Sequence, residues 1–150
     1  MLQHAASATP QIGHVFECVI PVRWGDQDAL GHVNNTLYLK YCEEARAQLY
    51  TCAGYMVPGE REAVLVHVSC DFLKPLMYPA TVVLRFVFTR LGRSSMEYDF
   101  VIERQDEPGV VYAHGKNITV NTDPATGKSC AWTAQELNNF ARCFVAAAAP

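Results

Sequence analysis

Apolar side chains occupy every second position near the start of the chain, at Phe16, Cys18, Ile20, Val22 and Trp24. A period of two is typical of a strand with one buried face. We therefore predict a first strand over residues 15–24. Four later stretches alternate in the same way and predict strands at 63–73, 81–91, 96–105 and 110–121.

Between the first strand and the other four, the apolar period lengthens to three and four residues, at Tyr38, Tyr41, Cys42, Ala45, Leu49 and Cys52. This spacing predicts an amphipathic helix over residues 35–53. Asn34 or Asn35 suits its N-terminal cap, because a short amide side chain accepts hydrogen bonds from the first free backbone amides. Gly54 stands where a C-terminal cap is expected.

Prolines, glycines and polar residues separate the predicted strands, so short connections join them and the last three strands form an antiparallel meander. Residues 121–128 predict another turn, and Thr133 or one of its neighbours is expected to cap a short helix ending near residue 145. The order of strand, long helix and four strands indicates an α+β fold. We expect one domain over residues 1–150, with flexible ends at 1–13 and 146–150.

A single helix covers only one face of such a sheet. Aromatic residues and valines on the other face are therefore expected to mark self-association, and we predict a homodimer or a tetramer.

Composition narrows the function. Half of the residues are hydrophobic and the net charge is -3, which fits a globular protein and disfavours nucleic acid or an anionic membrane as a partner. The first residues lack the basic start and apolar core of a leader, so we predict a cytoplasmic protein. The six cysteines form no C-x-x-C pair and no zinc spacing with histidine, so we expect free thiols and no metal site.

Residues 22–46 read VRWGDQDALGHVNNTLYLKYCEEAR, which places a carboxylate on a glycine-containing loop just before a capped helix. This stretch resembles the signature of the 4-hydroxybenzoyl-CoA thioesterase-like hotdog family, in which an aromatic-x-D-x-D segment precedes GHVNN and a helix ending in EEAR. The likeness extends more weakly over residues 16–132. It implies a hotdog fold, in which an antiparallel sheet wraps one long helix, and an active site between two subunits that hydrolyses acyl-CoA.

Carried over by position, the second aspartate of the D-x-D segment, Asp28, matches the catalytic carboxylate of the family, and Asp26 does not. Free backbone amides at a helix N-terminus suit a thioester carbonyl that gains negative charge. The candidate donors are the amides of Asn35 and Asn34. Asp28 is expected either to attack the carbonyl or to activate a water, and the sequence leaves both routes open.

His32 is a further candidate, either to orient Asp28 or to contact substrate, although a lone loop histidine is more often structural. Because some family members carry histidine at the position of Asn35, roles assigned in that subset do not transfer to this chain. Glu43 and Glu44 lie within the predicted helix, where some hotdog thioesterases use a glutamate. We interpret both as a solvated face that pairs with nearby cations.

His67, Ser69 and Asp71 share one face of a predicted strand and invite comparison with a catalytic triad. Strand residues two apart are separated by roughly 7 Å, too far for a nucleophile and its base. We interpret them as a polar sheet face.

Coenzyme A is part of the substrate, and no separate cofactor is expected, because the chain has no nucleotide-binding glycine motif. The phosphates of coenzyme A require basic residues at the mouth of the site. By resemblance, the turn of Arg93, Ser94 and Ser95 lies near the nucleotide or pantetheine. Arg90, Lys116 and Lys128 are weaker candidates.

Three rival functions remain open at this point. A thioesterase acting on acyl carrier protein would keep Asp28 but use a different partner surface. A non-catalytic acyl-CoA-binding hotdog protein is disfavoured by the intact Asp28. A hotdog dehydratase is disfavoured because the histidine-containing helix motif expected of that enzyme is not visible in this sequence. The acyl group itself is not predicted.

Overall fold

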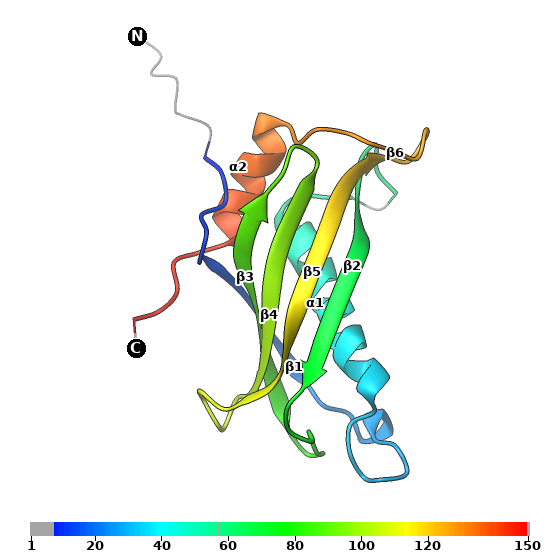
Figure 1. Ribbon diagram of the computed structural model, residues 1–150, viewed down its shortest axis with the longest axis vertical. Coiled ribbons are helices and arrows are strands. Elements are labelled where there is room, and N and C mark those ends of the chain that lie inside the picture. Colours follow the sequence, from blue (N-terminus) through cyan, green and yellow to red (C-terminus); the bar gives the residue numbers. More distant parts are fainter. Residues whose placement is uncertain (1–7, 57, 150) are drawn as a thin grey trace.

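The computed structural model describes residues 8–56 and 58–149, which form one antiparallel sheet and two helices. The strands are β1 (Val15–Pro21), β2 (Glu62–Phe72), β3 (Thr81–Leu91), β4 (Ser95–Arg104), β5 (Val111–Asp123) and β6 (Lys128–Ser129). The helices are α1 (Asn35–Cys52) and α2 (Ala134–Cys143). Figure 1 shows the long strands side by side, with α1 lying along one face of the sheet.

The strands lie in the order β1-β3-β4-β5-β2, with β6 beside β5, and every pair is antiparallel. Strands β3, β4 and β5 are consecutive neighbours, so the predicted meander is confirmed. Strands β1 and β2 form the two edges. One long helix held by a curved antiparallel sheet is the hotdog arrangement that the signature implied.

Helix α1 begins and ends within one residue of the predicted limits, because local side-chain chemistry determines both ends. The Asn34 side chain accepts a hydrogen bond from the Thr36 amide at 2.9 Å and so caps the first turn. Gly54 follows the last turn with a φ of +81°, a conformation that glycine adopts without strain. The buried residues of α1 recur at helical spacing: Tyr38, Tyr41, Cys42, Ala45 and Leu49.

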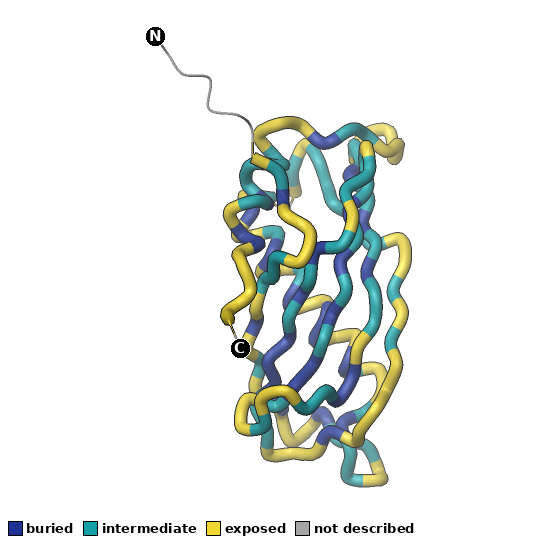
Figure 2. Tube along the Cα trace, turned by 60° about the vertical axis from the view of Figure 1, so that its left-hand side comes forward, coloured by how far each residue is buried: buried dark blue, intermediate teal, exposed yellow. Residues whose placement is uncertain are grey.

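The core lies between α1 and the inner face of β3 and β4. Figure 2 shows buried positions alternating along these central strands. Phe86, Tyr98 and Phe100 are fully buried there, and the small Ala45 lets the helix approach them. The aromatic residues Phe86, Tyr98 and Phe100 thus belong to the core, whereas Phe72 of β2 is exposed.

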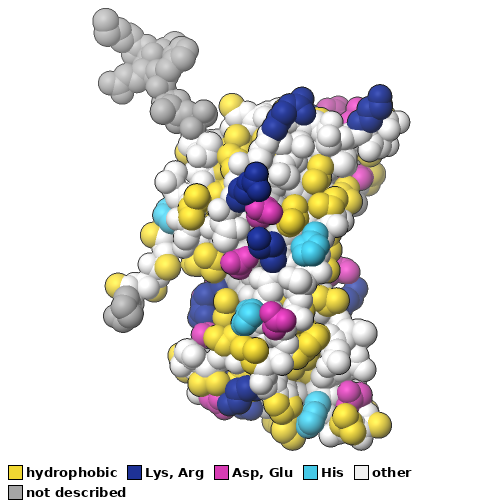
Figure 3. Space-filling view, in the orientation of Figure 1, with side chains coloured by type: hydrophobic (Ala, Val, Ile, Leu, Met, Phe, Trp, Pro, Cys, Tyr) yellow, Lys and Arg dark blue, Asp and Glu magenta, His cyan; other side chains and the backbone are white. Residues whose placement is uncertain are grey.

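The outer face of the sheet mixes hydrophobic and charged side chains, as Figure 3 shows. Its charges pair across strands, for example Arg85 with Glu103 at 2.6 Å and with Glu17 at 3.0 Å. Cross-strand neighbours of opposite charge stabilise a sheet modestly. This face contains valines but no aromatic cluster from β3 or β4.

The first strand is shorter than predicted. Strand β1 ends at Pro21, and residues 24–26 form a 3-10 turn that the Asp26 carboxylate stabilises by accepting the Arg23 amide at 2.9 Å. Trp24 consequently leaves the sheet and is 75% exposed. The alternating pattern fails at its last member because a side-chain cap overrides the strand period.

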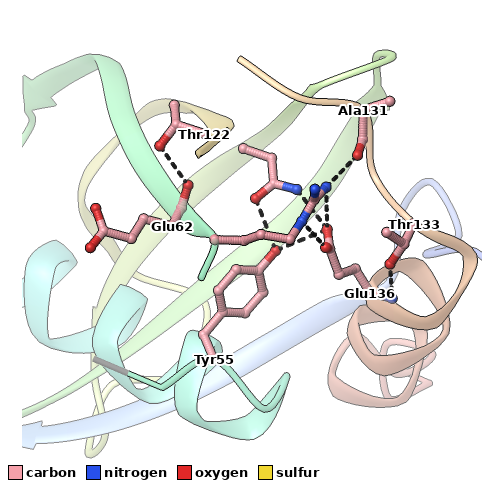
Figure 4. Close-up of polar contacts among 8 residues, drawn as sticks. Tyr55, Glu62, Thr122, Ala131, Thr133 and Glu136 are labelled. Atoms are coloured by element: carbon pink, nitrogen blue, oxygen red, sulfur yellow. Dashed lines mark hydrogen bonds and ion pairs between the residues drawn. The ribbon is translucent and has the colours of Figure 1, made fainter. Parts of the chain in front are cut away.

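The C-terminal part differs from prediction in one element. Strand β5 continues to Asp123 and pairs with the short β6, where a plain turn was predicted. Helix α2 begins as expected, with the Thr133 hydroxyl accepting the Glu136 amide at 3.1 Å. Glu136 also pairs with Arg61 and accepts from Asn121 at 2.6 Å and from Tyr55 at 3.3 Å (Figure 4). These contacts fasten α2 to the sheet and to the segment after α1.

The ends of the chain are only partly as predicted. Residues 1–7 lie outside the described part of the chain, whereas Pro10 is buried and the Gly13 amide donates to the Phe88 carbonyl at 2.8 Å. Residues 10–13 are thus attached to β3 rather than free. Residues 146–149 are exposed coil. None of the helices in the described residues is long and apolar enough to cross a membrane.

Candidate active site

The loop between β1 and α1 folds back on itself and is held by its backbone. Gln27 bridges to Val33, and the Asp28 amide donates to the His32 carbonyl at 2.8 Å. The Gly31 amide closes the turn by donating to the Asp28 carbonyl at 3.0 Å, and its φ of +75° suits glycine. Asp28 is therefore positioned at the base of a tight turn a few residues before α1.

The two aspartates of the D-x-D segment have different surroundings. The Asp26 carboxylate is buried and accepts hydrogen bonds from the Arg23 amide at 2.9 Å and from the Tyr41 hydroxyl at 2.7 Å. Burial, followed by this contact with Asp26, raises the pKa of Tyr41 well above its usual value, so the phenol stays a donor. Asp26 fastens the loop to α1 and is not available for chemistry.

Asp28 is half-buried, and only one of its oxygens is engaged. Its Oδ1 accepts the Leu30 amide at 2.9 Å, which forms an Asx turn within the loop. Its Oδ2 has no hydrogen-bond partner among residues 8–56 and 58–149. The side chain thus shapes the turn with one oxygen and leaves the other open.

The first amides of α1 are also unequal. The Asn34 amide donates to the Asp26 carbonyl at 2.9 Å, and the Thr36 amide donates to the Asn34 side chain. The Asn35 amide has no partner within the described part of the chain. The expectation that the Asn34 amide is a free donor is therefore wrong, because this amide is hydrogen-bonded within the folded loop. The Asn35 amide is the candidate donor that remains.

The His32 side chain is half-buried and makes no hydrogen bond with the described residues; only its backbone carbonyl contacts Asp28. Around this loop, large apolar side chains are exposed. Leu30 is 77% exposed, and Met77 and Tyr78 lie exposed in the segment after β2. That segment is attached to the loop because the Val33 amide donates to the Leu76 carbonyl at 2.7 Å.

The turn predicted to contact coenzyme A is not beside Asp28 in one chain. The β3–β4 turn lies at the α2 end of the sheet, and the loop before α1 lies at the other end (Figure 1). Arg93 is exposed there, and its carbonyl accepts the Trp132 amide at 3.0 Å. The Ser94 and Ser95 carbonyls also accept hydrogen bonds, while Arg90 sits 3.9 Å from Glu97. A single copy does not bring this turn and Asp28 together.

The remaining polar candidates are on the surface. Glu43 is exposed and pairs with Lys40 at 2.6 Å, which lowers the pKa of Glu43, and Glu44 accepts from Gln48 at 3.0 Å. His67, Ser69 and Asp71 are exposed along β2, and Asp71 faces His114 at 3.6 Å. Over the described ranges, no three histidine, cysteine or acidic side chains gather as metal ligands.

Sequence reasoning did not predict the polar contacts of the interior, and one of them joins α1 to β5. Arg46, on α1, donates to the side chain of Asn117, on β5, at 2.9 Å. Asn117 is fully buried. The only sequence signal for this pair is a polar residue within an alternating strand, because the two residues are 71 positions apart.

Known proteins with similar sequences and structures share this fold. The family model described as the thioesterase superfamily matches residues 30–111, which include Asn35 and α1 but begin just after Asp28. A solved structure from Pseudomonas aeruginosa, provisionally described as a thioesterase, is 36% identical with a TM-score of 0.76, covering 82% of this chain and 94% of that one.

Two more solved structures are similar. A Xanthomonas campestris protein, provisionally described as an acyl-CoA thioesterase, is 32% identical with a TM-score of 0.64 over 69% of this chain and 89% of its own. The 1,4-dihydroxy-2-naphthoyl-CoA thioesterase of Synechocystis is 19% identical, with a TM-score of 0.74 over 84% of this chain and 95% of its own, and shows the shared fold. With the family model matching more than half of its length, the chain belongs to the thioesterase superfamily and is a thioester hydrolase with the hotdog fold.

Proposed function

We propose that this protein hydrolyses acyl-CoA thioesters at the start of α1, where the Asn35 amide polarises the carbonyl and Asp28 drives the attack. The observation that carries the proposal is the pair of free groups: the Asn35 amide and Asp28 Oδ2 lack partners within the described residues, while their neighbours are engaged. A free amide at a helix N-terminus can donate to a carbonyl oxygen, and an open carboxylate oxygen can accept a proton or attack a carbon, so the two groups together suit thioester hydrolysis.

The chemistry follows from the two groups. As a nucleophile adds to the thioester carbon, negative charge builds on the carbonyl oxygen, and an amide at a helix N-terminus stabilises that charge with the helix dipole behind it. Collapse of the tetrahedral intermediate breaks the C–S bond and releases the thiolate of coenzyme A. The acid and the thiol are the two products.

Asp28 has two routes to start this step. As a general base, Oδ2 takes a proton from water while the water oxygen adds to the carbonyl carbon. As a nucleophile, Oδ2 forms a mixed anhydride and displaces the thiolate, and water then cleaves the anhydride. Both routes need the ionised carboxylate. In either route His32, whose imidazole lacks a protein partner in the described structure, is placed to contact the substrate rather than to orient Asp28.

The active unit is proposed to be a homodimer, or a tetramer made of two dimers, joined through β2. Strand β2 is an edge strand that exposes Val64, Val66 and Phe72, and an unpaired apolar edge favours pairing with another strand. Antiparallel pairing of two β2 edges about a two-fold axis turns the partner end for end. The α2 end of the partner, with its β3–β4 turn, then lies level with Asp28 of this chain.

This arrangement supports coenzyme A as the carrier. Arg93 is exposed and forms no ion pair within the described chain, so it is available to a phosphate across the dimer. Light scattering at assay concentration tests the assembly: a dimer or tetramer is expected, and a fully active monomer contradicts the shared site. Assays with matched acyl-CoA and acyl-carrier-protein substrates test the carrier, since faster hydrolysis of the protein-bound acyl group overturns this choice.

Asp28→Asn tests the catalytic proposal. Asparagine keeps the oxygen that accepts the Leu30 amide, so folding and melting temperature are expected to persist. It lacks the negative oxygen, so kcat for acyl-CoA hydrolysis is expected to fall by at least about 100-fold, with substrate binding retained. Near-normal turnover by this variant contradicts the mechanism.

Asp26→Asn is the matched control, because it makes the same chemical change two residues away. The variant weakens the contacts with the Tyr41 hydroxyl and the Arg23 amide, so the free energy of unfolding is expected to fall by about 1–2 kcal/mol. The kcat of the folded enzyme changes little. If both variants lose turnover equally, the two aspartates do not have separate roles.

A further inference from the structure

A groove runs along α1 from the proposed catalytic end. It has a volume of about 270 Å³ and lies between α1 and the inner side of β2. Thr36, which directly follows Asn35, lines its start, and Leu39, Leu65 and Val68 supply apolar walls. An acyl group whose carbonyl sits at the Asn35 amide therefore has a groove with apolar walls leading away from the site.

The far end of this groove is positively charged. Lys40 and Glu43 also line it, but they pair with each other at 2.6 Å. Arg46 has no carboxylate within 4.0 Å among the residues that the structure describes. The Glu43 carboxylate pairs with Lys40, which lowers the pKa of Glu43, and the charge of Arg46 is near enough to help lower it. A guanidinium without its own ion pair beside apolar walls favours an anion, since a charge-assisted hydrogen bond gains strength where water is partly excluded.

A second donor lies next to this arginine. Arg46 donates one bond to Asn117 Oδ1 at 2.9 Å, and the Nδ2 of the fully buried Asn117 has no partner within residues 8–56 and 58–149. None of the Arg46 nitrogens is buried without a partner, so the donors that Arg46 does not use remain accessible. A buried amide without an acceptor is costly, so the Arg46–Asn117 pair is a polar feature that packing alone does not explain.

The spacing fits the end of an acyl chain. Arg46 is eleven residues after Asn35, which is roughly 16 Å along a helix axis. Side chains lean toward the N-terminus of their helix, so the guanidinium lies about one turn nearer, at roughly 11 Å from the first turn. A medium-length straight acyl chain spans this distance, and a group at its far end meets Arg46.

We propose that Arg46 is a specificity residue that binds a carboxylate at the far end of the acyl group, so that the preferred substrate is an ω-carboxyacyl thioester, the monothioester of a medium-length dicarboxylic acid. This inference rests on the proposed function, because it assumes that the acyl carbonyl lies at Asn35. Asn117 holds the guanidinium in place by accepting one of its hydrogen bonds through Oδ1.

The test compares matched substrates that differ only at the chain end. Octanoyl-CoA and decanoyl-CoA are each assayed beside the ω-carboxy derivative of the same length, and the ratio of kcat/KM is measured. The ω-carboxy substrate is expected to be preferred at one length at least by about tenfold or more. A preference for the unsubstituted chain at every length overturns the proposal.

Variants assign the preference to Arg46. Arg46→Met keeps the length and apolar stem, and it is expected to abolish the preference by lowering kcat/KM for the ω-carboxy substrate while sparing the unsubstituted one. Arg46→Lys keeps the charge and is expected to retain part of it. Arg142→Met, which removes an exposed arginine of α2 outside the groove, is the matched control. An unchanged ratio in Arg46→Met overturns the proposal even if that variant is less stable.

Binding separates this inference from the proposed function. Calorimetry with Asp28→Asn measures the affinity for each substrate pair without turnover. If the wild type hydrolyses no acyl-CoA, the proposed mechanism fails, and Arg46-dependent tighter binding of the ω-carboxy compound still supports the groove assignment. Equal binding of both members of each pair, or binding of neither, overturns it.

Discussion

The two ends of this molecule treat polar groups in opposite ways. At the α2 end, Glu136 meets Arg61, Asn121 and Tyr55, so the buried polar groups satisfy one another. Burial, followed by the charge of Glu136, raises the pKa of Tyr55, which therefore remains a donor. At the other end, the Asn35 amide and Asp28 Oδ2 have no partner in the described residues, and Leu30 and Trp24 are exposed.

This difference distinguishes polar residues that stabilise the fold from polar residues that are kept for a substrate. A buried network stabilises the fold when its donors and acceptors bond to one another, whereas a catalytic group must keep its donor or acceptor free until substrate binds. The D-x-D segment shows the same contrast over two residues, since Asp26 is enclosed and Asp28 is open. Substitutions at the two ends should therefore change different quantities.

The largest effect is expected from Asn35→Pro. Proline suits the first position of a helix and removes only the backbone amide hydrogen, and the extended backbone of Asn34 suits a residue before proline. Without this donor, kcat is expected to fall by about 100- to 1,000-fold while the melting temperature holds. Asn35→Ala, which keeps the amide, is the control and should remain active. Equal activity of the two variants excludes the amide as the donor.

The next effect is on stability at the opposite end. Glu136→Ala removes the acceptor shared by Asn121, Tyr55 and Arg61, and leaves the buried Asn121 amide unpaired. The free energy of unfolding is expected to fall by about 2–3 kcal/mol in a denaturant titration. The kcat of the folded fraction should change little, and a large loss of kcat at full folding contradicts the division between the ends.

The smallest effect is expected on KM, from a change in Arg93. This residue lies at the α2 end of the sheet but is proposed to bind substrate at the active site of a partner subunit. Arg93→Ala is expected to raise KM for acyl-CoA by about three- to tenfold, since a phosphate contact binds ground and transition states alike. The difference from wild type should shrink as salt rises. Truncated thioesters without the nucleotide serve as the control, and an equal loss with them removes Arg93 from the phosphate contact.

Much of the fold was predictable because its signals are local. Strand period, helical period and capping residues act over a few positions, so the ends of α1 and the cap of α2 were predicted closely. The predictions failed where a side-chain cap or an additional strand pairing overrode the local pattern. Asp26 ended β1 early by capping the turn after it, and pairing with β6 extended β5 beyond the predicted turn.

The sequence by itself determined the class of the fold, the position of the long helix and the loop that carries Asp28, because each depends on spacing along the chain. Only the tertiary structure decided which groups are free. The Asn34 amide donates to the Asp26 carbonyl, and the Asp26 carboxylate accepts from the Tyr41 hydroxyl. Arg46 donates to Asn117, which lies 71 positions away in the sequence. Hydrogen-bonding capacity is settled by the groups that the fold brings together, and neither residue type nor spacing contains that information.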